Sequence, residues 1–223
     1  MPDRYKKDKY MKYTLSILLF CILMFLVPLQ GSGFDLGADI YNRYVWRGTD
    51  FGNTPAVQPY INYSIGGLEV GAWSSWSITG ASGGNENDLY ASYSYNNFSL
   101  TVTDYFFPGY TGDDGIDEFS ESGAHTVELS AGYSFADLSF LAAINVLGND
   151  SDNSKYVEVN YEFYTKKNLA ANVFIGAGDY IYTQDNNFTV VNLGLSVSRG
   201  RYNAAYIINP DQRTSFLTFG IAL

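Results

Sequence analysis

A period of two dominates the chain from about residue 35 to its C-terminus and leaves few folds open to it. Segments of about ten residues alternate apolar and polar side chains, and a turn signal closes each one. In one of them Val127, Leu129 and Ala131 share one face of a strand, whereas Glu128 and Ser130 share the other. After residue 33 the sequence shows neither a helical period nor an apolar run long enough for a membrane helix. The pattern therefore predicts an all-β protein.

The turn signals divide this region into twelve expected strands, with ten as the alternative count. The strands are expected at residues 35–47, 54–65, 68–78, 88–95, 98–107, 125–135, 138–147, 155–164, 169–178, 188–197, 202–209 and 213–223. Tight turns such as "GG" at 66–67 and "NN" at 96–97 alternate with longer loops, of which 108–124 is the longest. Short turns at one end and long loops at the other are typical of a transmembrane antiparallel up-and-down β-barrel.

A soluble β-sandwich would show the same alternation, so the choice of a membrane barrel depends on other features. Aromatic residues gather on the apolar face near the strand ends, as in the interfacial girdles of such barrels, and tyrosine alone occurs 20 times. The last strand, "TSFLTFGIAL", alternates up to the C-terminus and is similar to the signal that the barrel-assembly machinery recognises, although it ends in Leu223 rather than phenylalanine. These features favour a barrel in the outer membrane of a Gram-negative bacterium, with outer-membrane lipids and the assembly machinery as partners.

Residues 1–33 have the layout of an export signal. Five basic residues precede the apolar run "LSILLFCILMFLVPL", and "QGSG" then supplies small residues suited to cleavage. The alternative is a retained anchor helix, because the run is close to the shortest that can span a membrane. We expect a signal peptide that is cut between Gly31 and Phe34, followed by a single barrel domain over residues 34–223.

Cleavage at this point would change both the charge and the cysteine content. Residues 1–33 hold five of the 13 Lys and Arg residues and two of the 23 Asp and Glu residues, so eight basic and 21 acidic residues remain, a net charge of −13. Such a surface makes nucleic acid an improbable partner. Cys21 lies in the apolar run, so no disulfide is expected in the exported domain.

The segment "IYNRYVWRGTDFG" places two arginines among several rings. Because the first strand is expected to run to residue 47, we expect Tyr44 and Trp46 to face lipid near the outer interface and Arg43 and Arg47 to face the lumen. An arginine on the lipid face near the midplane would cost roughly 2–4 kcal/mol, which favours this assignment. The same parity argument predicts that the lumen is lined by Asp39, Arg43, Arg47, Glu69, Glu128, Glu158, Asn160 and Glu162.

Part of the chain resembles a known family. The element Tyr44-Val45-Trp46-Arg47-Gly48, the strand with Pro59 and the triplet Thr103-Asp104-Tyr105 are similar to the TorF family of proposed porins, most clearly over residues 40–108. The resemblance implies an outer-membrane barrel and a transport role, and it brings no catalytic set.

These observations lead us to expect a narrow porin for small polar solutes or ions, with a modest preference for cations because acids outnumber arginines in the predicted lumen. Two alternatives remain: a lipid-modifying outer-membrane enzyme that uses His125, the single histidine, and a structural or adhesive barrel without transport. His125 has no nucleophile motif beside it, and the acidic loops lack the spacing of a calcium site. We therefore expect no enzyme, metal or cofactor.

Overall fold

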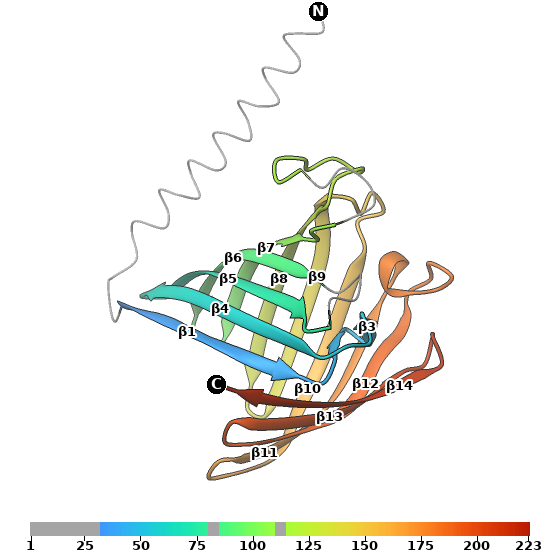
Figure 1. Cartoon of the computed structure of the whole chain (residues 1–223). Helices are drawn as coiled ribbons and strands as arrows, with labels where there is room; N and C mark the ends of the chain where they lie inside the picture. The colour runs from blue at the N-terminus through green and yellow to red at the C-terminus, as the bar shows by residue number, and fades with distance from the viewer. Residues whose placement is uncertain (1–31, 80–84, 110–114) are drawn as a thin grey trace, which may run out of the picture.

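Twelve antiparallel strands form one closed barrel in the computed structural model, which describes residues 32–79, 85–109 and 115–223. Each barrel strand pairs with the next one along the chain, and the last pairs with the first (Figure 1). The barrel strands are β1 (Ser32–Tyr41), β4 (Ala56–Ile65), β5 (Leu68–Ser77), β6 (Glu86–Tyr95), β7 (Phe98–Phe106), β8 (His125–Phe135), β9 (Leu138–Gly148), β10 (Lys155–Lys166), β11 (Leu169–Gly178), β12 (Thr189–Arg199), β13 (Tyr202–Asn209) and β14 (Thr214–Ala222). The predicted barrel is confirmed, with twelve strands rather than ten.

Most strand boundaries agree with the alternation in the sequence. The predictions for residues 125–135, 169–178 and 202–209 match β8, β11 and β13 to the residue. The predicted signal segment lies outside the described residues, except for Ser32 and Gly33, which begin β1. In the described part of the chain, helices with the length and apolar character needed to cross a membrane are absent.

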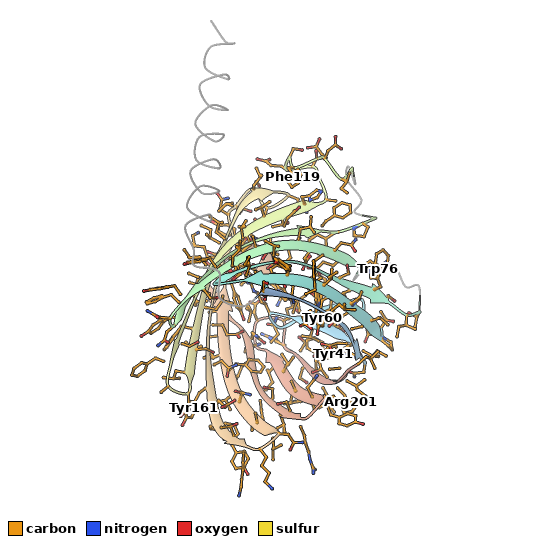
Figure 2. All side chains as sticks on the ribbon, turned by 90° about the vertical axis from the view of Figure 1, so that its left-hand side faces the viewer. Tyr41, Tyr60, Trp76, Phe119, Tyr161 and Arg201 are labelled. Carbon is orange, nitrogen blue, oxygen red and sulfur yellow. The ribbon has the colours of Figure 1, made fainter. Side chains whose placement is uncertain are left out.

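The two faces of the barrel wall differ in polarity. Large apolar side chains cover the outer face, and Leu36, Leu89 and Leu100 are 72%, 64% and 65% exposed. Figure 2 shows Trp76 and Tyr161 on this outer side, with Tyr60 among the side chains inside the barrel. An apolar surface of this extent would be unfavourable in water, and it is consistent with a barrel that lies in an outer membrane.

The first predicted strand, 35–47, is wrong beyond Tyr41. β1 ends at Tyr41, and the chain then leaves the wall and forms a separate two-stranded hairpin from β2 (Tyr44–Trp46) and β3 (Thr49–Phe51). Arg47 and Gly48 form its turn with φ values of 49° and 81°. Two positive φ values are what a tight hairpin of the primed type requires, so "RG" is a turn signal within an otherwise uninterrupted alternation.

Asn42 carries the chain from the wall to the hairpin and closes the seam of the barrel. β1 pairs with β14 over three residues only, from Asp39 to Tyr41. Beyond them Asn42 Nδ2 donates to the Leu217 carbonyl at 3.1 Å, and Asn42 Oδ1 accepts from the Phe219 amide at 2.7 Å. The side chain therefore satisfies two backbone groups of β14 at the point where β1 no longer can.

We expect Gly48→Ala to destabilise the protein more than Gly109→Ala. Both glycines have left-handed backbones, with φ of 81° and 82°, so alanine costs about 1–2 kcal/mol at either position. A Cβ at Gly48 would overlap the Val191 carbonyl oxygen, whereas a Cβ at Gly109 would meet no atom of the described residues within 4 Å. This clash should add about 1–3 kcal/mol to the cost at Gly48 alone. Urea unfolding in liposomes measures the difference, and equal losses would contradict the position of the hairpin turn.

Candidate functional site

The hairpin of residues 42–55, which we call the inner hairpin, lies within the barrel at the long-loop end. Its turn reaches the opposite wall at β8, where Arg47 pairs with Glu128, and Gly48 lies against Val191 of β12, three strands from β1. Asn209 Nδ2 donates to the Gly48 carbonyl at 3.2 Å, and Gln212 Nε2 donates to Thr49 Oγ1 at 3.4 Å. Figure 1 shows β3 between β4 and β12. The inner hairpin therefore crosses the lumen.

Arg47, in the turn of the inner hairpin, forms a bidentate ion pair with Glu128 of β8. Its Nη1 lies 2.5 Å from Glu128 Oε2, and its Nη2 donates to Glu128 Oε1 at 2.9 Å. Nη1 also donates to the hydroxyl of Tyr182 at 2.6 Å. The side chains of Arg47 and Glu128 are 8% and 3% exposed, so both charges are removed from water and depend on each other.

Aromatic rings complete the surroundings of the guanidinium. The Cζ atom of Arg47 lies 4.3 Å from the ring centroid of Trp46, 4.4 Å from that of Tyr156 and 5.4 Å from that of Tyr182. Tyr182 belongs to the short 3-10 helix η1 (Tyr180–Tyr182) in the loop before β12. Burial raises the pKa of Tyr182 to about 12, so its hydroxyl keeps its proton at neutral pH. These rings hold the cation by cation–π attraction in a site without bulk water.

The prediction that Tyr44 and Trp46 face lipid is wrong. Tyr44 is buried, and its ring centroid lies 5.4 Å from that of Trp73 on the inner face of β5. Trp46 packs edge-on against Tyr105 of β7 at 5.5 Å. Because the chain turns inward at Asn42, the rings that were assigned to the outer girdle instead anchor the inner hairpin to the barrel wall.

The predicted lumen residues fall into two groups. Arg43 and Arg47 lie on the inner hairpin rather than on the wall, and Arg43 Nη1 lies 2.6 Å from Asp50 Oδ2 within the same hairpin. The structure places the remaining six predicted residues on the inner parity of barrel strands: Asp39, Glu69, Glu128, Glu158, Asn160 and Glu162. Glu128 pairs with Arg47, whereas the other predicted acids, Asp39, Glu69, Glu158 and Glu162, form no ion pair with either arginine in the described part of the chain.

Two of these acids have neutral partners. The Glu69 carboxylate accepts hydrogen bonds from Ser64 Oγ and from Tyr90 Oη, each at 3.0 Å. Glu158 accepts from Tyr156 Oη at 2.5 Å and from Asn192 Nδ2 at 2.9 Å. Hydroxyl and amide donors stabilise a carboxylate without cancelling its charge.

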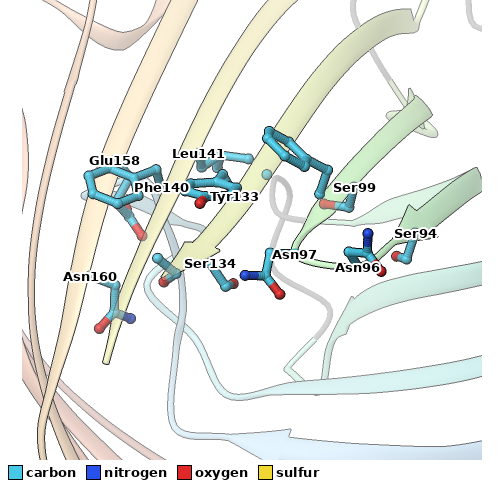
Figure 3. A pocket seen from close by; sticks show the side chains of 13 residues that line it. Ser94, Asn96, Asn97, Ser99, Tyr133, Ser134, Phe140, Leu141, Glu158 and Asn160 are labelled. Atoms are coloured by element: carbon cyan, nitrogen blue, oxygen red, sulfur yellow. The ribbon is translucent and has the colours of Figure 1, made fainter. Parts of the chain in front are cut away.

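A cavity of about 440 Å³ lies at the short-turn end, beside Glu158 and Asn160 (Figure 3). Its other polar residues come from the turns and strand ends: Ser94, Asn96, Asn97, Ser99, Ser134 and Ser139. Phe98, Tyr133, Phe140 and Leu141 also contribute to the lining, so the cavity combines hydroxyl and amide groups and one carboxylate with apolar side chains.

The sequence analysis did not identify Glu86 and Asp88 as lumen residues. Both lie on the inner parity of β6 and are 2% and 8% exposed. Glu86 Oε2 and Asp88 Oδ1 are buried and have no hydrogen-bond partner among the described residues. The start of this strand was predicted at residue 88, and the loop before it contains "NEN", so Glu86 looked like a solvated loop residue.

His125 lies outside the lumen, on the outer face at the long-loop end. Its Nδ1 is 2.8 Å from Asp104 Oδ1, and its ring stacks between Phe106 at 4.6 Å and Phe119 at 4.0 Å. His125 Nε2 is buried and has no hydrogen-bond partner among the described residues. Asp104, which shares the apolar parity of its strand, therefore has a partner at this rim.

Metal ligation has no support in the part of the chain that the structure describes, where no group of three or more His, Cys, Asp and Glu residues is arranged to hold an ion.

We expect the Arg47–Glu128 pair to contribute to stability as a unit. Arg47→Met or Glu128→Gln alone leaves one buried charge without its partner and should cost about 3–5 kcal/mol in the free energy of unfolding. The double variant should cost less than the sum of the two, which unfolding in liposomes measures as a coupling energy. Arg43→Met is the control, because the Arg43 side chain is 28% exposed and its pair should be worth about 1 kcal/mol or less. Additive single effects would contradict direct coupling.

Comparison with known proteins identifies the family to which this chain belongs. A comparison with curated proteins gave no match. A family model described as a bacterial protein of unknown function, Gcw_chp, matches residues 30–221, which include all twelve barrel strands except the last residue of β14. This match does not name the TorF porins, so that resemblance stays a prediction. The chain belongs to Gcw_chp, a bacterial family of unknown function.

Proposed function

We propose that this protein is a narrow channel in the outer membrane of a Gram-negative bacterium, which passes small polar solutes and prefers cations over anions. The observation that carries the proposal is the charge of the barrel interior. Both arginines inside the barrel are matched one to one, Arg43 by Asp50 and Arg47 by Glu128. Further acids on the inner parity have no basic partner among the described residues.

These further acids leave the interior negative. Asp39, Glu69, Glu158 and Glu162 lie on the inner parity. The basic residues of the barrel strands, Lys155, Lys166 and Arg199, follow the outer alternation or lie at strand ends. Low-dielectric walls focus the field of such acids along a lumen, so cations should be concentrated there and anions depleted.

The inner hairpin supports a narrow rather than a wide passage. Eight strands leave an interior that side chains fill, and 16–18 strands leave an aqueous channel, so twelve fall between these cases. The inner hairpin crosses the lumen at the long-loop end and occupies part of this intermediate space. A solute would pass beside it, or the hairpin would move.

Export and assembly complete the proposal. A signal peptide over residues 1–33 would deliver the chain to the periplasm, and the alternating C-terminal strand would engage the barrel-assembly machinery. The short-turn end, which holds both ends of the barrel domain, would face the periplasm, and the inner hairpin would lie at the extracellular end.

We propose a structural rather than a catalytic role for His125. Asp104 orients its ring, as in a hydrolase, and this contact is the observation that favours an enzyme. However, the ring is 3% exposed beneath Phe119, and no serine, threonine or cysteine of the described residues hydrogen-bonds to its Nε2. The stacked ring and its carboxylate instead tie the loop before β8 to the outer wall.

Replacing Glu158 and Glu162 by glutamine should weaken the cation preference. Both carboxylates lie on the inner parity of β10, so their removal lowers the negative potential of the lumen without changing its shape. The reversal potential of planar bilayers under a KCl gradient reports the change. Asp152→Asn with Asp185→Asn is the matched control, because it removes two exposed loop charges and should leave selectivity nearly unchanged.

An anion-selective wild-type channel would refute the charge argument. A folded barrel that inserts into bilayers and conducts nothing would refute transport and favour the structural or adhesive alternative.

A further inference from the structure

A second cavity, of about 190 Å³, lies between the inner hairpin and the strands β7, β8 and β9 at the long-loop end. The hairpin supplies Trp46, Thr49 and Phe51 to its lining, and the wall and loops supply aromatic and polar groups. A single water occupies about 30 Å³ in the liquid, so the cavity has room for a small organic molecule but not for a peptide or a lipid chain.

Five of the ten residues that line the cavity are aromatic. Besides Trp46 and Phe51, the lining includes Tyr105, Phe107 and Tyr182. Trp46 meets Phe51 and Tyr105 at interplanar angles of 72° and 62°, so these rings line the space at angles to one another instead of stacking flat and closing it. Flat aromatic walls favour a ligand with an apolar face that can lie against a ring.

One lining residue has a buried polar atom that lacks a partner among the described residues. Asn145 is 1% exposed, and its Nδ2 donates to Asp150 Oδ2 at 2.7 Å. That bond fixes the amide orientation and leaves Asn145 Oδ1 as an acceptor with no hydrogen-bond donor among the described residues. A buried acceptor of this kind is stabilised by a ligand that brings an N–H or O–H group to it.

The backbone around Asn145 keeps this acceptor in place. The Asn145 amide donates to the Ser154 carbonyl at 3.0 Å, and Asn153 Nδ2 donates to the Asn145 carbonyl at 3.0 Å. Asn149 also lines the cavity, and its Oδ1 accepts a hydrogen bond from the Thr126 hydroxyl. This bond fixes the orientation of the amide, so Asn149 Nδ2 is the atom that can donate to a ligand. The cavity thus combines an acceptor and a donor with apolar rings.

The charges around the cavity disfavour an anionic ligand. Arg47, whose Cζ lies 4.3 Å from the Trp46 ring centroid, is matched by Glu128, so these two charges offset each other. Asp150, which accepts a hydrogen bond from Asn145, adds a further negative charge beside the lining and would repel an anion. A neutral ligand avoids this penalty.

We propose that this cavity is a binding site for a neutral sugar ring at the outer mouth of the channel. A pyranose has hydroxyl groups around its edge, which can donate to Asn145 Oδ1 and accept from Asn149, and C–H faces that can lie on the aromatic walls. The inference deepens the proposed function, on which its meaning as a solute-capture site rests. Binding itself requires no conduction.

The test uses the full barrel domain, folded in detergent, with saturation-transfer NMR and calorimetry. Glucose should bind with millimolar affinity, whereas glucuronate, its anionic counterpart, should bind at least about tenfold more weakly. Asn145→Leu keeps the branched shape of the side chain without its polar atoms and should weaken glucose binding about tenfold, the equivalent of one hydrogen bond.

Two pairs of variants separate binding from folding. Phe107→Leu removes a ring from the cavity wall and should weaken binding, whereas Phe119→Leu removes a ring that stacks on His125 outside the cavity and should not. Asn160→Leu at the short-turn end is the control for Asn145→Leu. The heat-modifiable mobility of the barrel in gels shows whether each variant is folded.

Failure of glucose to bind the folded wild type, or equal binding by Phe107→Leu and Phe119→Leu, would overturn the site. Tighter binding of adenine than of glucose would overturn the sugar assignment, because a flat heterocycle would then be the better match to the rings. Since none of these measurements needs a conducting channel, a barrel that binds glucose without conducting would refute the proposed function alone.

Discussion

The buried ion pair between Arg47 and Glu128 joins the inner hairpin to the barrel wall, and the arrangement of the interior depends on it. A guanidinium is costly to remove from water unless its charge and its N–H groups are matched. Glu128 matches the charge through two contacts, Tyr182 accepts a further hydrogen bond, and three rings cover the remaining surface. The pair also brings Trp46 between Tyr105 and Tyr182, and these three rings form part of the wall of the second cavity, between the inner hairpin and β7, β8 and β9.

The two ion pairs of the inner hairpin also determine which charges of the lumen remain unmatched. Counted from the sequence, two arginines inside the lumen would offset part of its acids and could line an anion path. In the structure each arginine has its own carboxylate, so neither is free to offset the other acids on the inner parity. The field along the remaining lumen is therefore set by acids without a basic partner among the described residues, including Glu69 and Glu158, which accept hydrogen bonds from hydroxyl and amide groups.

Alternation and turn residues were enough to predict the wall of the barrel. β8, β11 and β13 begin and end where the sequence changes from period two to turn chemistry, because side chains on a two-faced wall must alternate. The inner hairpin was missed for the same reason. Residues 44–46 continue the alternation of β1, and a strand inside the lumen has the same local pattern as a strand in the wall. The one local signal was Gly48 after Arg47, a turn pair with arginine where asparagine is usual.

The position of Trp46 tests the central claim most directly, since it distinguishes an inner hairpin from a continuation of β1 that faces lipid. The chain has three tryptophans, so Trp73→Phe with Trp76→Phe leaves Trp46 as the single fluorophore, and Trp46→Phe with Trp73→Phe leaves Trp76. In bilayers that contain brominated lipid, quenching reports contact with the acyl chains. We predict strong quenching of Trp76 on the outer face and almost none of Trp46. Equal quenching of the two would place Trp46 on the lipid face and contradict the inner hairpin.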